Sequence, residues 1–384
     1  MRIAFAIVSL FPGGGLQRDC INIGRRVRNL GHEVTIFTSR KSGDGFVADL
    51  PVRILNVPSR TNHQRQRAFS DELKRVAAGK FDIIVGFDKL EGLDILYCSD
   101  GSMRARVIRN PLLRLLPRYR EYINLEKACF APQLTNKIVL LSEPQLNEYW
   151  TSWATEQSRL TVLPPTLDTA RCRPHYRIDG TREKYRASAG LSTDDWAWIA
   201  ICVQPKTKGL DRTIRALRHF PKARLLIVGL NEWEEKCSKI RNLADRYAVT
   251  NRITWLGHRE DVPELMAAAD LFVHPARYDT TGTVILETIA NGLPVVTTST
   301  CGYAKHVSSA NSGVVLQEPF RQRDFVRALS NARDPGQTMQ WSKHGSDYGK
   351  RSSLYEGRAC AAELIVASAL ERSRAAMQMK SNLA

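Results

Sequence analysis

The stretch Asp270–Thr298, DLFVHPARYDTTGTVILETIANGLPVVTT, predicts how the surrounding chain is built. It begins with a short apolar run and continues through a loop that contains Asp279. A helical segment follows from about Gly282 to Asn291, and then a second apolar run, PVVTT. Short apolar runs on either side of a helix are typical of strands buried on both faces of a parallel sheet. The stretch therefore predicts one β-α-β unit.

The same alternation extends through both halves of the 384-residue chain. Buried strands are predicted at RIAFAIVSL, GHEVTIFT, FDIIVGF and NKIVLLS in the first half, and at WAWIAICVQ, ARLLIVGL and RITWLG in the second. The proline-containing LTVLPPTLD forms a stiff connector between the halves. We therefore predict an α/β protein of two Rossmann-like β/α/β domains facing a cleft. The predicted parts are one domain over 1–165, a second domain over 166–345, and over 346–384 a helix able to cross back to the first domain, with a polar tail.

Composition narrows the class of protein. The formal net charge of +17 favours an anionic partner, which is nucleic acid, a membrane face or an acidic substrate. None of the eight cysteines has Cys-x-x-Cys spacing, which argues against a disulfide framework or a zinc site and fits a reducing cytoplasm. The apolar run Ile3–Leu10 is shorter than a signal peptide needs, and no run approaches the roughly 20 residues of a membrane span. We expect a cytoplasmic protein.

Two carboxylates bracket the start of the helix predicted after Asp279. Thr281, Gly282 and Thr283 would offer free backbone N–H groups to a phosphate, and they are small enough to let it approach. Glu287 lies about one and a half turns further on, where a carboxylate can accept hydrogen bonds from a vicinal diol such as a ribose. Asp279 would reach a second hydroxylated group. This order of groups predicts a nucleotide sugar, and the alternative is that both acids only complement the helix dipole.

Two other segments offer contacts to a diphosphate. Lys206 and Lys208 follow a predicted strand, where lysines can offset the charge on a departing diphosphate, although a solvated turn is the simpler explanation of either alone. Gly13, Gly14 and Gly15 follow the first strand without the spacing of a dinucleotide fold or a P-loop. Their backbone N–H groups would approach an anion across the cleft, and a tight turn that needs positive φ is the alternative.

The acid-x₇-Glu pattern followed by Gly-Leu-Pro-Val-Val resembles the retaining glycosyltransferases of GT-B fold. The resemblance is closer still to the family of lipopolysaccharide core heptose glucosyltransferases, and it runs through nearly the whole chain. The similar stretches are FPGGGLQRD, TNH, VGFDKLEGLD, PRYREY, LPP, KGLDR, ELMAAADLFVHPA, LETIANGLPVVTT, CGYA and EPF. It implies transfer of a hexose, glucose from UDP-glucose, to a heptose or similar sugar of the lipopolysaccharide core. It implies that the domain over 1–165 binds the acceptor and that the domain over 166–345 binds the nucleotide sugar. It also implies a lipid-anchored acceptor and no cofactor besides the donor.

The resemblance also implies roles for individual residues. Asp279 would hold hydroxyls of the donor sugar, Glu287 would hold the ribose, and Lys208 would bind the diphosphate. The implied catalytic residues are Asp279, Lys208 and Asp100, which would lie near the reacting sugar. The other implied donor contacts are Gly14, Gly15, Lys206, Thr281, Gly282 and Thr283 around the phosphates and Gly229, His258 and Arg259 near the base. In the retaining mechanism the acceptor hydroxyl attacks on the face that the diphosphate leaves.

Two departures leave the donor sugar open. The family usually has Glu at the position of Asp279, and Val203 stands where many relatives carry an arginine, with Lys206 as the candidate substitute. GDP-mannose or another nucleotide sugar is therefore the alternative donor. The sequence contains no Asp-x-Asp motif, so we expect no obligatory metal. A basic nucleic-acid-binding protein and a sugar-nucleotide epimerase are the remaining alternatives, but the sequence contains no recognisable nucleic-acid module.

The segment Met103–Phe130, MRARVIRNPLLRLLPRYREYINLEKACF, interleaves basic and apolar residues. Pro111 and Pro117 interrupt any single helix through it. The spacing predicts an element that lies on an anionic membrane at the cytoplasmic face, and the alternative is a helix packed on its own domain with solvated arginines. The arginines predicted to face the membrane are Arg104, Arg106, Arg109, Arg114, Arg118 and Arg120.

Overall fold

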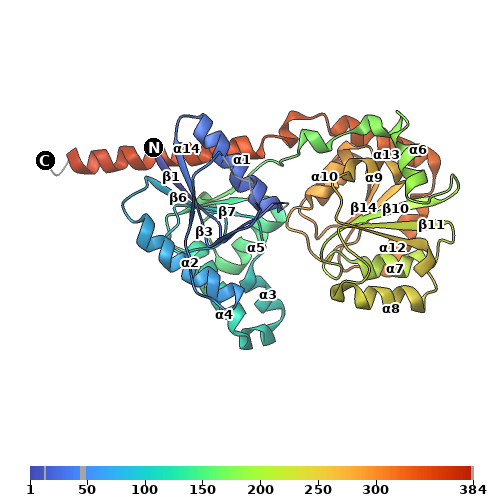
Figure 1. The fold of residues 1–384 in the computed structure, drawn as a ribbon, viewed down its shortest axis with the longest axis horizontal. Coiled ribbons are helices and arrows are strands. Elements are labelled where there is room, and N and C mark those ends of the chain that lie inside the picture. The colour runs from blue at the N-terminus through green and yellow to red at the C-terminus, as the bar shows by residue number, and fades with distance from the viewer. Residues whose placement is uncertain (13, 44–48, 382–384) are drawn as a thin grey trace. The chain divides into compact units, whose positions relative to one another are not determined.

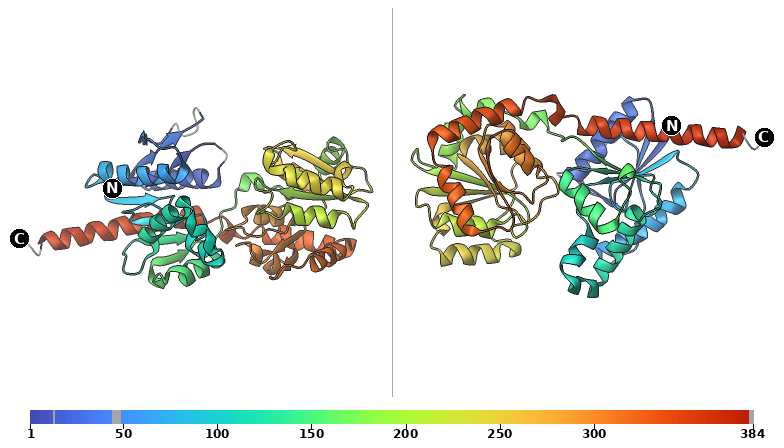
Figure 2. Two further views of the ribbon diagram at one scale, coloured as in Figure 1. Left: turned by 90° about the horizontal axis from the view of Figure 1, so that it is seen from below. Right: turned by 180° about the vertical axis from the view of Figure 1, so that it is seen from behind.

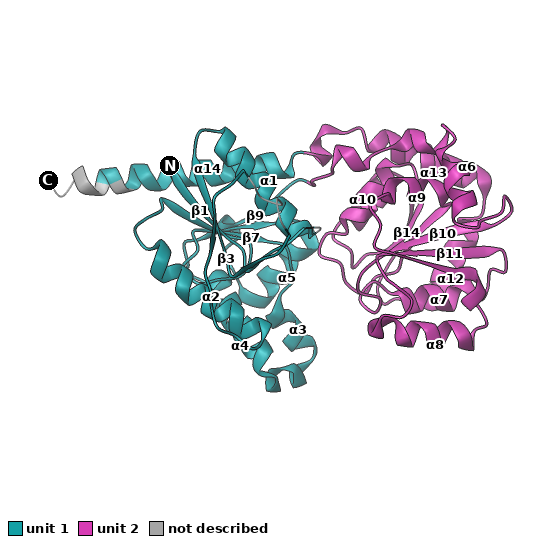
Figure 3. Cartoon of the chain, in the orientation of Figure 1, with its two compact units in different colours: residues 1–164, 356–384 teal, residues 165–355 magenta. Residues whose placement is uncertain are grey.

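The computed structural model describes residues 1–12, 14–43 and 49–381, so Gly13 lies outside the described residues. The chain forms two compact units, Met1–Pro164 with Glu356–Ala384 and Pro165–Tyr355 (Figure 3). The first break falls within the proline-containing connector. The second falls after Tyr355, ten residues beyond the predicted position, because helix α13 (Pro335–Tyr348) packs within the second unit.

Unit 1 is built on a seven-stranded sheet in the order β5-β3-β1-β6-β7-β8-β9, with every neighbouring pair parallel. The strands are β1 Arg2–Ala6, β3 Glu33–Thr38, β5 Val52–Ile54, β6 Ile83–Gly86, β7 Ile95–Cys98, β8 Lys137–Leu140 and β9 Leu160–Val162. A separate parallel pair is formed by β2 (Ser9–Leu10) and β4 (Arg40–Lys41). The order reverses direction at β1, which is the Rossmann arrangement.

Helices cover both faces of this sheet (Figures 1 and 2). They are α1 Gly15–Asn29, α2 Asn62–Ala77, α3 Met103–Arg109, the 3₁₀ turn η1 Pro111–Leu115, α4 Pro117–Phe130, α5 Glu143–Trp153 and α14 Gly357–Ser381. One apolar core joins α1 and α14 to the sheet, and another joins α2, α4 and α5 to the opposite side. The chain terminus thus contributes to the core of unit 1 through Ala362 and Ile365.

Unit 2 is also built on a parallel sheet, which has six strands in the order β12-β11-β10-β13-β14-β15. Its strands are β10 Trp196–Ile201, β11 Ala223–Val228, β12 Ile253–Gly257, β13 Leu271–His274, β14 Val295–Thr298 and β15 Gly313–Leu316. Its helices are α6 Thr181–Ser188, α7 Leu210–Leu217, α8 Ser238–Arg246, α9 Val262–Ala268, α10 Thr283–Ala290, α11 Ala304–Ser309, α12 Gln322–Asn331 and α13. The β13-α10-β14 unit predicted from the sequence lies at the centre of this sheet (Figure 1).

Two apolar cores flank the sheet of unit 2, one on the side of α9, α10 and α11 and the other on the side of α7, α8 and α12. The parallel sheets, buried on both faces, explain why the strands appear in the sequence as continuous apolar runs. Within the described residues, no helix combines the length and the apolar character needed to cross a bilayer.

Candidate functional site

Polar residues of unit 2 gather at the carboxyl ends of β10 and β13, which are neighbours in the sheet. Lys208 lies in the turn after β10, and Asp279 lies in the loop after β13. Gly209 brings these segments together, because its φ is 72° and a Cβ there would lie 1.9 Å from the carbonyl oxygen of Pro275. Only glycine meets both conditions. The KGLDR sequence therefore places Lys208 directly against the loop that carries Asp279.

Asp279 is the centre of the cluster. Its Oδ2 atom lies 2.7 Å from Nζ of Lys208 and 3.0 Å from Nε2 of His274. His274, the last residue of β13, is buried, whereas the side chains of Asp279 and Lys208 retain some exposure. The structure thus brings together two residues that the sequence assigned to the donor, and it adds a histidine.

The contacts around Asp279 determine the protonation states of Asp279 and His274. Burial raises the pKa of Asp279, but the hydrogen bond from His274 and the charge of Lys208 outweigh it and hold the pKa at about 2. Burial lowers the pKa of His274, but hydrogen bonds to Asp279 and Cys301 raise it to about 9. At neutral pH, two cations therefore surround one carboxylate. A net positive charge at strand ends is suited to an anion such as a diphosphate.

The loop around Asp279 is held by a neighbouring segment. Asp279 and Cys301 form an isolated parallel β-bridge, and the amide of Tyr303 donates to the carbonyl of Thr281 at 2.6 Å. Gly282, with φ at 74°, directly precedes α10, and a Cβ on it would lie 3.4 Å from Oδ2 of Asp279. The glycine thus brings the start of α10, and its free backbone N–H groups, next to the carboxylate.

The remaining predicted residues of this loop lie along α10. The hydroxyl oxygens of Thr281 and Thr283 are 3.4 Å apart at the start of the helix. Glu287 is buried, and its Oε1 lies 2.7 Å from Nε of Arg171. Asn291, at the end of α10, donates to the carbonyl of Arg171 at 2.8 Å. Glu287 therefore has a cationic partner within unit 2.

The other predicted donor contacts of unit 2 are at neighbouring strand ends. Lys206 is exposed in the turn after β10, and its carbonyl accepts a hydrogen bond from Arg277 at 2.7 Å. Gly229 directly follows β11 with φ at 94°, and its amide donates to the carbonyl of Gly257, the last residue of β12, at 2.6 Å. His258 and Arg259 are exposed after β12, and Arg259 pairs with Asp261. Lys206 thus shares the turn of Lys208, whereas Gly229, His258 and Arg259 lie in other loops at the carboxyl ends of the strands.

One group in this cluster has the composition of a metal site. Ligand atoms of His274, Asp279 and Cys301 all lie within 4.8 Å of one another. Nitrogen, oxygen and sulfur ligands of this kind suit a zinc ion. Lys208 contacts the same carboxylate oxygen, however, and His274 is protonated at neutral pH, so both compete with a cation.

In unit 1, the predicted site residues lie at the carboxyl ends of β1 and β7. Gly14 precedes α1 with φ at −75°, so the expectation of positive φ does not apply to it. A Cβ at this position would lie 1.9 Å from Oε1 of Gln17, so the end of that flexible side chain would have to move. At Gly15, a Cβ would meet nothing within 4 Å among the described atoms. Gly15 is the first residue of α1.

Asp100 follows β7 and is supported by a buried ion pair. Lys89 donates to Oε2 of Glu126 at 3.0 Å, and its Nζ lies 3.1 Å from Oδ1 of Asp100. Burial raises the pKa of Glu126, but the charge of Lys89 and several hydrogen bonds hold it below its ordinary value. The Asp100 side chain is exposed, and its contact with the buried Lys89 fixes its position.

The basic segment of unit 1 has two parts. The end of α4 is core, with Leu125 and Phe130 buried. The turn between α3 and α4 is exposed, and the apolar side chains uncovered there are Ile108, Leu112, Leu115 and Leu116. The packed-helix alternative thus holds for the end of α4, and the membrane prediction concerns the exposed turn.

The six arginines also differ from one another. The Arg104 guanidinium lies 4.5 Å from the ring centroid of Trp153, and Arg109 pairs with Glu148 at 3.0 Å. Arg106 and Arg118 line a pocket. All six except the half-buried Arg106 are exposed; Arg114 lies in the turn η1, and Arg120 lies in the first turn of α4.

Two parallel-sheet units with polar clusters at their strand ends are typical of the GT-B fold. Residues 181–345 match the family model of the glycosyl transferases group 1. The chain is 34% identical over 379 residues to the lipopolysaccharide glucosyltransferase WaaG of Escherichia coli (strain K12), covering 95% of this chain and 98% of that protein. It therefore belongs to the group 1 glycosyltransferases, in the family of that enzyme.

Solved structures agree with this assignment. A crystal structure of WaaG, described as a glycosyltransferase involved in lipopolysaccharide biosynthesis, has a TM-score of 0.85 at 33% identity, covering 94% of this chain and 99% of that one. The Anabaena protein Alr3699/HepE, solved in complex with UDP-glucose, has a TM-score of 0.74 at 18% identity, covering 96% and 100%. The second likeness concerns the fold alone.

Sequence reasoning missed three residues of the unit 2 cluster. His274 ends an apolar strand directly before a proline, five residues from Asp279, and this spacing was the signal available. Cys301 begins the CGYA stretch, but nothing in that stretch indicates contact with His274. Arg171 lies far from Glu287 in sequence, and its pairing depends on tertiary packing.

Proposed function

We propose that the protein transfers glucose from UDP-glucose to a heptose or similar sugar of the lipopolysaccharide core, with retention of the anomeric configuration. The observation that carries the proposal is the contact between Lys208 and Asp279 beside the start of α10. Its family membership supports the class of reaction, and the name of the Escherichia coli relative, a lipopolysaccharide glucosyltransferase, supports glucose as the transferred sugar and lipopolysaccharide as the acceptor.

The geometry suits a reaction in which charge develops on the leaving diphosphate. Lys208 and the protonated His274 would offset that charge, while the N–H groups at the start of α10 would donate hydrogen bonds to the phosphate oxygens. Asp279 would orient the sugar hydroxyls and hold both cations in place. The acceptor hydroxyl attacks on the face that the diphosphate leaves, and an oxygen of the leaving group takes its proton.

The donor is tested by product analysis. The protein is incubated with UDP-glucose, UDP-galactose, UDP-glucuronate or GDP-mannose and a heptose-containing core acceptor, and the released nucleotide is identified. We expect UDP from UDP-glucose and a product with the anomeric configuration of the donor, measured by NMR. Release of GDP alone would replace the donor by GDP-mannose, and an inverted product would reject the retaining mechanism.

The ribose contact is tested at Glu287. Glu287→Ala is expected to reduce kcat/KM roughly 100-fold, since hydrogen bonds to a charged group contribute about 1.5–3 kcal/mol. Because the same change leaves Arg171 without its carboxylate, Arg171→Gln serves as the control for loss of the ion pair alone. Near-wild-type turnover by folded Glu287→Ala would contradict the nucleotide-sugar role of this stretch.

We further propose that catalysis needs no metal ion. Lys208 and His274 supply the positive charge that a metal would otherwise provide, and they contact the carboxylate that a metal would use. Activity is therefore expected to survive EDTA. Loss of activity that magnesium or manganese restores would contradict the proposal.

We also propose that the protein works at the cytoplasmic face of the membrane, where it meets a lipid-anchored acceptor. The exposed leucines between α3 and α4 would enter the interface, and Arg114 and Arg120 would face anionic headgroups. Binding of this kind is reversible and weakens with salt.

A further inference from the structure

Three side chains of unit 2 bring a nitrogen, an oxygen and a sulfur ligand together. They belong to His274 at the end of β13, Asp279 in the loop that follows, and Cys301 shortly after β14. The candidate ligand atoms of all three lie within 4.8 Å of one another. The mechanism proposed above uses His274 and Asp279 but gives no role to the thiol. The group therefore combines two residues of the donor site with a cysteine that transfer does not use.

The separations of these atoms are close to those of a zinc site. Zinc ligands lie about 2.0–2.3 Å from the ion, so two ligands of a tetrahedral site are roughly 3.3–3.8 Å apart. Oδ2 of Asp279 and Nε2 of His274 are 3.0 Å apart. Side-chain shifts of about 1 Å would therefore bring all three ligand atoms to tetrahedral distances. Three protein ligands leave the fourth position of the ion open to water.

The fold holds each ligand in place. His274 pairs with Thr297 in the register of β13 and β14, and the Thr297 hydroxyl donates to the carbonyl of His274 at 3.0 Å. The same hydroxyl lies 3.5 Å from Sγ of Cys301. The β-bridge between Asp279 and Cys301 is extended by the amide of Gly302, which donates to the carbonyl of Asp279 at 2.9 Å. Outer contacts of this kind orient metal ligands before an ion arrives.

Lys208 is the side chain that a metal ion would have to displace. Its Nζ lies 2.7 Å from Oδ2 of Asp279, and its side chain is 22% exposed, whereas that of His274 is 2% exposed. A lysine on its flexible stem can turn away from the carboxylate, while the two buried ligands stay where the strands hold them. Because Lys208 and the proton of the imidazole both compete with the ion, binding is expected to be reversible.

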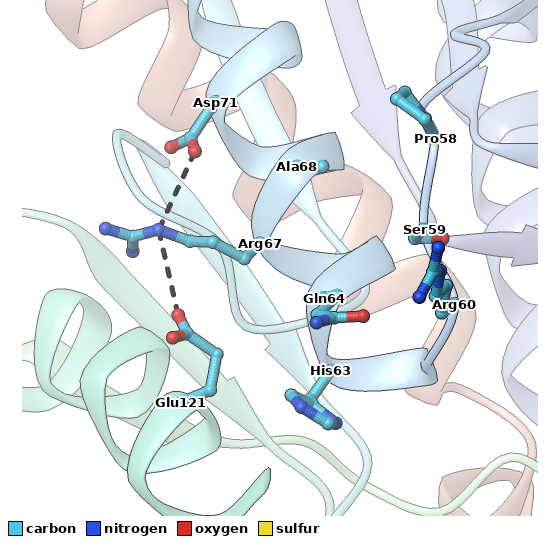
Figure 4. A pocket seen from close by; sticks show the side chains of 9 residues that line it. All are labelled: Pro58, Ser59, Arg60, His63, Gln64, Arg67, Ala68, Asp71 and Glu121. Atoms are coloured by element: carbon cyan, nitrogen blue, oxygen red, sulfur yellow. Dashed lines mark ion pairs between the residues drawn. The ribbon is translucent and has the colours of Figure 1, made fainter. Parts of the chain in front are cut away.

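A group of histidine and carboxylates in unit 1 differs in this respect. His63, Asp71 and Glu121 line a pocket of about 660 Å³ (Figure 4). Arg67 lies between the two carboxylates, with Nε 3.7 Å from an oxygen of each, and its guanidinium also pairs with Glu91. A guanidinium keeps its charge, and the lining of this pocket as the structure describes it contains no thiol. The cluster of unit 2 is therefore the better site for a metal ion.

We propose that His274, Asp279 and Cys301 form an inhibitory site for zinc and chemically similar divalent cations. A bound ion would take the Asp279 oxygen that Lys208 contacts, and it would displace the charge of Lys208 from the donor site. It would also occupy the carboxylate that the proposed function assigns to the sugar hydroxyls. The inhibition thus rests on the proposed function, whereas binding of the ion does not. Nitrogen and sulfur ligands favour zinc and cobalt over magnesium.

Binding is tested with Co²⁺, whose absorption reports its ligands. Metal-free full-length protein is titrated with Co²⁺ in the absence of donor, and zinc is then added as a competitor. We expect a thiolate-to-cobalt charge-transfer band that zinc removes. In Cys301→Ser the band should be absent and the Kd for zinc should rise at least about 100-fold, since loss of an outer contact alone typically costs about 10- to 100-fold. Wild-type protein without the band would overturn the proposal.

Lys208→Met gives a result that misfolding does not imitate. This variant removes the competing cation and leaves the three ligands unchanged. Its affinity for Co²⁺ and for zinc is therefore expected to rise roughly 10-fold above that of the wild type. Unchanged or weaker binding by the folded variant would show that the ion does not use the Asp279 oxygen, and it would overturn the proposal.

The matched control is Cys172→Ser with Cys360→Ser. Both thiols are partly exposed, so adventitious metal would bind to them before it reached a buried cysteine. The control is expected to keep the charge-transfer band and the wild-type Kd for zinc. A band that is lost in the control, or one that persists in Cys301→Ser, would assign the metal to another thiol and overturn the proposal.

The inhibitory effect is measured with whichever donor supports transfer. Zinc is expected to inhibit the wild type in the micromolar range, EDTA to restore the full rate, and magnesium at the same concentration to have no effect. Relative to its own zinc-free rate, Cys301→Ser should need at least about 100-fold more zinc for half inhibition. Full activity of the zinc-saturated wild type would overturn the inhibitory role. Failure of transfer with every donor would reject the proposed function, while the Co²⁺ titration still decides the site.

Discussion

Each unit contains a lysine paired with a carboxylate just beyond a parallel strand, and the two pairs have different surroundings. In unit 1, Lys89 and Glu126 are 3.0 Å apart, with side chains 6% and 0% exposed. In unit 2, Lys208 and Asp279 are 2.7 Å apart, with side chains 22% and 13% exposed. The same chemical pair is closed to solvent in one unit and partly accessible in the other.

Hydrogen bonding explains what each pair can do. Oε1 of Glu126 accepts from the Ser102 hydroxyl at 2.6 Å and from the Trp153 indole at 2.6 Å, and Oε2 accepts from the Met103 amide at 2.8 Å. The carboxylate thus holds the start of α3 and has little capacity left for a ligand. The side chain of Asp279 contacts Lys208 and His274 through Oδ2. The closed pair supports structure, whereas the accessible pair suits an exchange of partners with substrate.

The largest effect is expected from breaking the closed pair. Glu126→Ala leaves the buried Lys89 with Asp100 as its remaining carboxylate neighbour and removes an acceptor from Ser102 and Trp153. Such a loss typically costs about 3–5 kcal/mol. The variant should unfold at much lower urea concentration. The surface partner of Lys137 provides the control, since Glu371→Ala should leave the midpoint unchanged. Equal midpoints for both variants would contradict the structural role of Glu126.

Breaking the accessible pair should affect activity instead of folding. Lys208→Met keeps much of the side-chain volume but removes the charge next to Asp279. If Lys208 stabilises the leaving diphosphate, kcat should fall about 10²- to 10³-fold, as it does when one preorganised donor is lost. Rate and urea midpoint are measured on the same preparation. A variant that unfolds early but turns over normally would assign Lys208 to stability and remove it from the mechanism.

The pH dependence of stability provides a third test. The pKa of His274 is raised to about 9 in the folded protein, above its ordinary value. The folded state therefore binds more protons between about pH 6.5 and 9, so the stabilisation is complete below that window and is lost as the pH rises through it. The expected loss is on the order of 3 kcal/mol.

Substitution of His274 checks the origin of this loss. In His274→Gln, stability between pH 6.5 and 9 should become nearly independent of pH, measured by urea titration without donor. Asp279 remains ionised throughout this window, because its pKa is about 2. A wild-type stability that rises from pH 6.5 to 9 would contradict the protonated pair.

Local sequence patterns predicted most of the fold. Apolar runs such as Leu271–His274 and Val295–Thr298 predict buried parallel strands, because both faces of each sheet are covered. The Gly-Leu-Pro segment and Gly282 mark the ends of α10, so the position of Asp279 before a helix could also be predicted. These inferences need only neighbours in sequence.

Contacts between distant segments could not be predicted in the same way. Lys89 and Glu126 look like ordinary charged surface residues in the sequence, yet packing of α4 beside β6 and β7 buries both. The spacing of Arg106 and Arg118 suggests one basic face, but the break at Pro111 changes the direction of the chain. Both arginines then line the same pocket. These contacts depend on tertiary packing, which the periodicity of residues within one helix does not reveal.

The smallest effect is expected at the turn between α3 and α4, where the side chains of Leu112 and Leu115 are 73% and 78% exposed. Each arginine near an anionic surface contributes on the order of 1 kcal/mol, and burial of a leucine adds a similar increment. Arg114→Gln with Arg120→Gln should therefore weaken binding to phosphatidylglycerol vesicles by roughly 10- to 30-fold at low salt.

Leu112→Ser with Leu115→Ser separates the apolar contribution from the electrostatic one. This variant should lose a similar amount of vesicle binding, but the loss should persist at high salt, where the charge contribution is screened. The pair Arg53→Gln with Arg75→Gln carries the same charge change as the arginine variant but lies away from the turn, so it should bind vesicles like wild type. Equal wild-type binding to neutral and anionic vesicles would show that bulk hydrophobicity governs binding. Equal losses in both arginine variants would show that net charge governs it. The turn would then be an exposed loop without a membrane role, and transfer to a lipid-anchored acceptor would have to rely on the saccharide contacts of the two units alone.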